Sequence, residues 1–322
     1  MAVSARQTRG YAGADCLTAF SEMNPHSLLR PEFVAAAILI LSPMLYAAFA
    51  PENFAALGLR MPRAACIALP AILCIPYALI ADAFGMFRWQ WLTLYALLPV
   101  AIAFVLDQAR EAHGSERGDW RDFLILILLG LAVDLRWLEP AWPQGLAVAG
   151  KMLLLDAGIY GFLAVRRLDG VGFDLRLKAR DVGIGLREFL FYAPIAIVLG
   201  LALGFIHFHA GWPAPLRALG AYAFTFFFIA IPEELFFRGW IQNLLERRIG
   251  RTAALFATAI LFGLSHWNKQ TTNFNWRYAL LAAIAGVFYG RAWRGKRYGQ
   301  RRVGASALTH ATVDTLWSLW FR

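Results

Sequence analysis

Long apolar stretches fill most of this chain, and short polar segments separate them. A helix needs about 20 mostly apolar residues to cross the hydrocarbon core of a bilayer. The pattern therefore predicts an all-α fold, a polytopic helical membrane protein with roughly 8–10 transmembrane helices. The candidate spans are 33–50, 64–84, 89–106, 122–135, 146–165, 188–208, 217–235, 252–267, 277–291 and 304–321. The span at 122–135 is the weakest, because its apolar part is short and runs into Asp134 and Arg136.

Composition strengthens the membrane interpretation. Of 322 residues, 59% are hydrophobic and only 16% are charged, whereas soluble domains have about 25% charged residues. A membrane β-barrel would show short alternating strands, and these runs are continuous. We expect a multi-pass protein of the cell (inner) membrane, with the lipid bilayer as its main surroundings.

The net charge of +10 does not indicate nucleic-acid binding, because the basic residues gather in short connections between apolar stretches. Segments 166–187, 238–251 and 291–302 are rich in Lys and Arg. Segment 209–216 has no charged residue and 268–275 has only Lys269. Basic and uncharged connections alternate, as successive crossings require. Since cytoplasmic connections carry the excess of Lys and Arg, we place the three basic segments in the cytoplasm.

Three regions follow from these patterns. Residues 1–32 are of mixed composition and lack the compact apolar core of a signal peptide, so we interpret them as an N-terminal tail. Residues 33–185 form N-terminal membrane helices to which the sequence assigns no role. Residues 186–322 carry the candidate chemistry. The cysteines Cys16, Cys66 and Cys74 have no CxxC spacing, so neither a disulfide framework nor a zinc knuckle is expected.

Ionisable residues within apolar stretches are costly, by at least about 2.5 kcal/mol for a charge at a helix centre. They gather on three late helices. Glu234 and Arg238 are four residues apart, so they share a helix face and can form an ion pair. Glu233 points away from that face and has no local partner, which suits a general base.

Two histidines complete the polar cluster. His266 ends the stretch LFGLSHW, with Phe262 one turn before it, and His310 lies one turn before Asp314. Glu233 lies 17 residues before Gly250 and His266 lies 16 residues after it. Antiparallel helices that turn near Gly250 would therefore hold both side chains at the same depth.

These residues form the motifs EExxxR, FxxxH and HxxxD, in that order. The chain resembles the CPBP family of intramembrane proteases, which includes CAAX prenyl endopeptidases and the Abi-like bacteriocin-processing and self-immunity proteins. The resemblance covers about 186–322, and Gly286 and Gly290 suit the family's glycine-bearing helix. Many members have Asn where this chain has Asp314, and an aspartate donates a hydrogen bond only when protonated.

The resemblance implies hydrolysis of a peptide bond in a membrane-anchored protein or peptide substrate. Glu233, helped by His266, would activate a water molecule. His310 with Asp314 would stabilise the oxyanion, while Glu234, Arg238 and Phe262 would support the site. No cofactor is expected. Zinc bound by Glu233, His266 and His310 is the alternative, which the absence of HExxH disfavours.

Two other classes of function stay open. A transporter or ion-conducting protein could use the same cluster as a proton path, although the chain has no internal repeat. A non-catalytic scaffold would not need two glutamates and two histidines at these spacings.

Overall fold

The computed structural model describes residues 30–113, 118–143, 145–209, 211–269, 274–295 and 300–321. The tail predicted at 1–32, with Cys16, lies almost wholly outside the described residues. The described chain is helical and contains no strand. The α-helices are α3 (Pro31–Phe49), α4 (Pro51–Arg60), α5 (Arg63–Ala68), α6 (Cys74–Ala83), α7 (Trp89–His113), α8 (Trp120–Asp134), α9 (Ala147–Ile159), α10 (Ala179–Ala202), α11 (Pro215–Thr225), α12 (Ile231–Glu234), α13 (Asn243–Ile249), α14 (Arg251–Leu264), α15 (Trp276–Arg294) and α16 (Val303–Trp320).

Several of these helices are joined end to end by 3-10 or π-helical turns. The 3-10 helix η1 (Leu69–Leu73) joins α5 to α6, and a separate one, η2 (Glu139–Ala141), precedes α9. The π-helices are η3 (Tyr160–Val165), η4 (Phe226–Ala230) and η5 (Leu235–Gln242). As a result α11, η4, α12, η5 and α13 form one rod of 35 residues, Pro215–Ile249.

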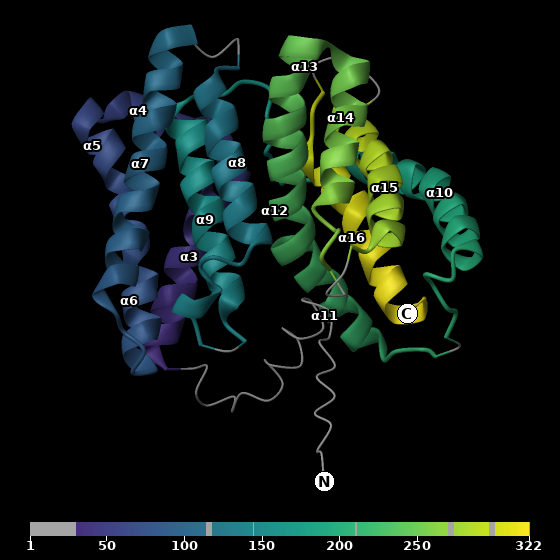
Figure 1. Ribbon diagram of the computed structural model, residues 1–322. Coiled ribbons are helices and arrows are strands. Elements are labelled where there is room, and N and C mark those ends of the chain that lie inside the picture. The colour runs from purple at the N-terminus through teal and green to yellow at the C-terminus, as the bar shows by residue number, and fades with distance from the viewer. Residues whose placement is uncertain are drawn as a thin grey trace.

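The polytopic all-α prediction is confirmed. By length and composition, six helical rods of the described chain could cross a membrane: Pro31–Phe49, Arg63–Ala83, Trp89–Ala112, Ala147–Val165, Ala179–Ala202 and Pro215–Ile249. The other predicted spans are short helices, such as α8 and the apolar α14, or helices that carry polar residues, such as α15 and α16. Successive rods run in opposite directions, except that Trp89–Ala112 and Ala147–Val165 run the same way because α8 returns the chain between them, so the connections fall at two ends of the molecule (Figure 1).

Helix boundaries follow local sequence. Pro31, Pro51 and Pro215 stand in the first turn of their helices, where the missing N–H costs nothing. Asp119 caps α8 by accepting the Arg121 N–H at 2.9 Å. Gly250, with φ of +79°, makes the sharp turn between α13 and α14.

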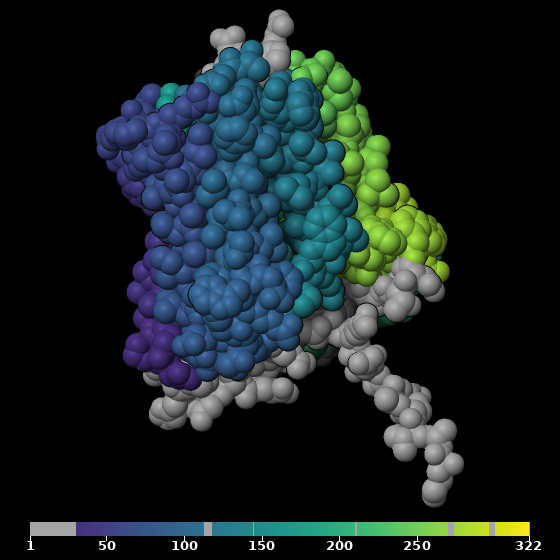
Figure 2. Space-filling view, turned by 60° about the vertical axis from the view of Figure 1, so that its left-hand side comes forward, coloured from purple at the N-terminus to yellow at the C-terminus, as the bar shows by residue number. Residues whose placement is uncertain are grey.

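The N-terminal and C-terminal helices pack along the rod 215–249. Trp240 of η5 stacks on Phe162 of η3 with ring centroids 4.9 Å apart, and Gly158 leaves the space that the indole fills. The space-filling view shows the N-terminal helices as one continuous side of the molecule (Figure 2). The N-terminal half also contains an ion pair between the fully buried Arg166 and Asp122, 2.8 Å apart. The Trp240 contacts therefore hold the rod that carries the glutamates against the N-terminal helices.

Close packing of α14 on α15 predicts a stability effect. A Cβ added at Gly263 would lie 2.4 Å from the Ala279 carbonyl oxygen and 2.6 Å from the Ala283 Cβ. We expect Gly263→Ala to lower the free energy of unfolding by about 1–3 kcal/mol, because the two backbones must separate. Gly183→Ala on α10 is the control, since nothing lies within 4 Å of its added Cβ. Thermal unfolding in detergent measures both, and equal midpoints for the two variants would contradict the prediction.

Candidate active site

The structure brings the ionisable residues of three helices together. Glu233 and Glu234 end α12, and Arg238 follows one turn later in η5. His310 and Asp314 lie on α16. His266 lies in the turn that follows α14.

His310 is the centre of the cluster. Its side chain is buried, and its Nδ1 lies 2.8 Å from Glu234 Oε1. Its Nε2 lies 3.3 Å from Asp314 Oδ2 and 3.9 Å from Glu233 Oε2. Both ring nitrogens face carboxylate oxygens, which accept hydrogen bonds, so the imidazole can donate from either nitrogen. The His310–Asp314 pair expected from the spacing is therefore present, and Glu234 holds the other side of the ring.

Glu234 and Arg238 form the predicted ion pair, 3.1 Å apart, with both side chains fully buried. Arg238 Nη2 also donates to the Gly286 carbonyl oxygen at 3.1 Å. The guanidinium lies 4.5 Å from the centroid of the Phe262 ring. Ser306 donates a hydrogen bond to the second oxygen of Glu234. This network fixes the carboxylate that in turn orients His310.

Glu233 has a partner that the sequence did not reveal. Lys269 Nζ lies 3.5 Å from Glu233 Oε1, so the expectation of an unpaired carboxylate is wrong. The reason is tertiary: the turn after α14 carries Lys269 back to the rod. The other oxygen, Oε2, is buried and makes no hydrogen bond to any described residue. That oxygen is positioned to accept a proton.

His266 is oriented by its own backbone. Its Nδ1 lies 2.8 Å from the Phe262 carbonyl oxygen, one turn earlier. Because a carbonyl only accepts, this contact places the hydrogen on Nδ1 and leaves a lone pair on Nε2 in the neutral ring. His266 also lies three residues before Lys269, the partner of Glu233. Through Lys269 the segment that carries His266 therefore comes close to Glu233, in keeping with the equal spacing of the two candidate bases from Gly250.

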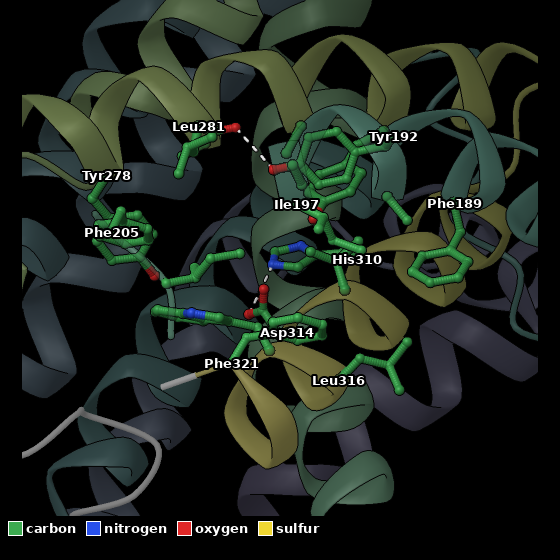
Figure 3. A pocket seen from close by; sticks show the side chains of 18 of the residues that line it. Phe189, Tyr192, Ile197, Phe205, Tyr278, Leu281, His310, Asp314, Leu316 and Phe321 are labelled. Carbon is green, nitrogen blue, oxygen red and sulfur yellow. Dashed lines mark hydrogen bonds and ion pairs between the residues drawn. The ribbon is translucent and has the colours of Figure 1, made fainter. Parts of the chain in front are cut away.

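A cavity of about 150 Å³ lies beside the cluster, between α10, α15 and α16. Its walls are mostly apolar and aromatic, and His310 and Asp314 are among the residues that bring polar atoms to it (Figure 3). His266 lines it as well. Glu233 does not line this cavity, but its Oε2 lies 3.9 Å from Nε2 of His310, which does. The volume is enough for water, which occupies about 30 Å³ per molecule in the liquid. The cavity thus offers an apolar chain segment a place beside the imidazoles.

Sequence analysis missed three contributors to the site. The ring of Tyr289 stacks on His310 with centroids 4.7 Å apart and planes 16° apart. Ser306 precedes His310 by four residues, and this spacing could have placed it on the same helix face. Lys269 stood out as the single charge in its segment. Tyr289 carried no signal, because aromatic residues are frequent throughout the chain.

The side chains do not fit a zinc centre as arranged. Among the described residues no group of three or more His, Cys, Asp or Glu side chains is placed to hold a metal ion. Of the three alternative ligands, His310 uses both ring nitrogens for carboxylate contacts, which leaves neither nitrogen free for a metal ion.

Fold and site together define a multi-pass helical membrane protein with a buried histidine–carboxylate cluster. Residues 215–316 match the type II CAAX prenyl endopeptidase Rce1-like family, which confirms the resemblance inferred from the motifs. All seven candidate site residues fall in the matched segment. The match supports an intramembrane endopeptidase of the CAAX type in general terms. No curated protein and no solved structure matches the chain.

Proposed function

We propose that the protein hydrolyses a peptide bond of a membrane-anchored protein or peptide, with Glu233 and His266 as the bases that activate water. The observation that carries the proposal is His310, held between Glu234 and Asp314 with the free oxygen of Glu233 3.9 Å from its Nε2. A base and a hydrogen-bond donor thus lie side by side, and the donor lines an apolar cavity.

The proposed reaction uses these groups in sequence. Glu233 takes a proton from water as the oxygen attacks the scissile carbonyl carbon. His310 Nε2–H donates to the oxyanion that forms, and Asp314 and Glu234 keep the ring in place. The carbon–nitrogen bond then breaks, and the proton held by Glu233 passes to the leaving amine. His266, with its free Nε2, assists the removal of the first proton.

Cells that lack the protein provide the test of function. We expect their membrane fraction to accumulate unprocessed forms of one or a few membrane-anchored proteins, detected by mass spectrometry of protein termini. Expression of the wild-type chain should restore processing, and expression of Glu233→Gln should not. Restoration by Glu233→Gln would favour a scaffold and contradict the proposal.

The same mechanism predicts independence from added metal. A carboxylate base needs no ion to activate water, so we expect cleavage by the purified, metal-analysed protein to survive exhaustive treatment with EDTA or phenanthroline. Loss of cleavage that stoichiometric zinc restores would instead make Glu233, His266 and His310 ligands. An inactive protein that zinc does not rescue would point to damage by the chelator.

A further inference from the structure

The surface where the end of α4 meets η3 carries two arginines without acidic partners. Arg60 is the last residue of α4 and is exposed. Arg167 lies two residues after η3, and its Nη2 donates to the Gly58 carbonyl oxygen at 2.6 Å. Gly58 is two residues before Arg60, so both guanidinium groups belong to one place, which we call the arginine corner (Arg60 and Arg167). No ion pair joins either of them to an acid of the described residues.

The backbone is shaped to place Arg167 at this corner. Arg167 has a φ of +54°, in the left-handed region that residues other than glycine rarely adopt. Because this conformation is unfavourable for a residue with a Cβ atom, the contacts around it must hold it. Gly58 permits one of these contacts, since a Cβ at this position would collide with the Ala164 carbonyl oxygen of η3. Close packing of α4 on η3 therefore maintains a strained turn that brings a partly exposed arginine to the end of α4.

The neighbouring arginines already have acidic partners. Arg63 begins α5 and pairs with Asp107 and with Glu111, both at 2.7 Å. Arg110 pairs with Asp107 at 2.5 Å. These two positive and two negative charges cancel. The excess positive charge of this part of the surface therefore comes from the arginine corner.

The arginine corner lies at the depth of lipid headgroups. Trp89, exposed at the beginning of α7, is typical of a membrane interface. Arg110 lies 21 residues later on the same helix, which is about 30 Å at 1.5 Å per residue and matches the thickness of the hydrocarbon core. Arg110 is joined through Asp107 to Arg63, three residues after Arg60. The helices α4 and α5 accordingly lie beside the C-terminal half of α7 (Figure 1).

Exposed apolar side chains lie next to the corner and lead away from it along α7. Leu59, which directly precedes Arg60, is exposed. Leu97 and Phe104 are exposed as well, and their spacing of seven residues places them on one face of α7. Phe104 lies one turn before Asp107, so this face continues from the charged residues toward the middle of the bilayer. A ligand that has both a phosphate and acyl chains would contact the arginines and this apolar face together.

We propose that the arginine corner binds the phosphodiester group of an anionic phospholipid, with its acyl chains against Leu59 and Phe104. A guanidinium can donate two parallel hydrogen bonds to a phosphate, and clusters of basic residues at the ends of transmembrane helices bind anionic headgroups. A zwitterionic phospholipid carries an amine that offsets its phosphate, so the corner selects the anionic lipid. The site lies in the N-terminal half, to which the sequence assigned no role, and it does not depend on the proposed function.

Thermal unfolding of the purified full-length protein in a neutral detergent tests the proposal. A ligand that binds the folded protein raises its unfolding midpoint. We expect dioctanoyl-phosphatidylglycerol to raise the midpoint in a saturable way, and dioctanoyl-phosphatidylcholine or inorganic phosphate at the same concentration to leave it unchanged. Arg60→Gln should weaken the apparent affinity for phosphatidylglycerol about fivefold, the contribution of one arginine near an anionic headgroup. Arg60→Lys, which keeps the charge, should retain most of the affinity.

Arg180→Gln is the matched control, because Arg180 is also exposed and has no acidic partner among the described residues. It removes the same charge at the beginning of α10 and should leave the affinity unchanged. Equal weakening by Arg60→Gln and Arg180→Gln would show a general attraction between charges and would overturn the proposal. The absence of any stabilisation by phosphatidylglycerol would overturn it too. An equal effect of phosphatidylcholine, or of inorganic phosphate, would exclude selective binding of an anionic lipid. Since Arg60 is exposed, Arg60→Gln should unfold at the wild-type midpoint when no lipid is added.

Discussion

Replacing Glu233 by Gln is expected to abolish peptide hydrolysis while the helix bundle stays intact. The amide keeps the size of the side chain but cannot accept a proton from water. General base catalysis contributes about 10²–10⁴-fold to rate, so turnover should fall by at least that factor. His266→Ala is expected to have a comparable effect, because it removes the second lone pair at the site. Cleavage of a processed substrate, followed in purified protein in detergent, measures both.

Matched control variants at other positions distinguish a loss of catalysis from a loss of stability. Glu111→Gln changes a carboxylate that is 45% exposed on α7, and His207→Ala removes an exposed imidazole. Both controls should keep wild-type turnover. Thermal unfolding midpoints of all four variants should stay close to the wild type. If Glu233→Gln or His266→Ala retained more than a small fraction of turnover, the catalytic assignment would be wrong.

Breaking the Glu234–Arg238 pair is expected to act mainly on stability. Removing one member of a buried pair leaves the other charge uncompensated, at a cost of about 3–5 kcal/mol. Arg238→Ala should therefore lower the unfolding midpoint strongly. Glu234→Gln should do so as well, and it should also reduce activity because it weakens the support of His310.

The double replacement distinguishes a true pair from two independent contributions. Since the residues touch, the loss in Glu234→Gln/Arg238→Ala should be smaller than the sum of the single losses. The ion pair of Arg30 with Glu32 is the control, because both side chains are about half exposed and such pairs contribute about 1 kcal/mol or less. Additive losses at Glu234 and Arg238 would show that the two charges do not stabilise one another.

Interactions within one helix were predictable, because helical geometry fixes them. The spacing of Glu234 from Arg238 and of His310 from Asp314 sufficed to pair them. Apolar stretches likewise indicated most of the helices. The shared depth of Glu233 and His266 followed from equal distances to a single turn, which is also a local property.

Contacts between distant segments were not predictable in the same way. The pair of Glu233 with Lys269 depends on the path of the turn after α14, and the stacking of Tyr289 on His310 depends on how α15 meets α16. Nor did the sequence indicate that Arg166 would bury its charge against Asp122, because the two lie 44 residues apart. A single sequence, without side-chain positions, does not show which residues of distant segments come into contact.

The π-helical turns on both sides of Glu233 and Glu234 have a consequence for how this chain tolerates insertions and deletions. A π turn accommodates one more residue per turn than the α-helix around it. Loss of one residue from 235–242 would let the rod relax toward regular α-helix, so the segments before and after the deletion would keep nearly the same relative orientation. The glutamates and Trp240 should then both keep facing their present partners. A one-residue deletion in a regular α-helix rotates the two flanking segments by about 100° relative to each other. A one-residue deletion in the π-helical stretch should therefore be better tolerated than one in the regular helix α14, where it would turn the end that carries His266 by about 100°.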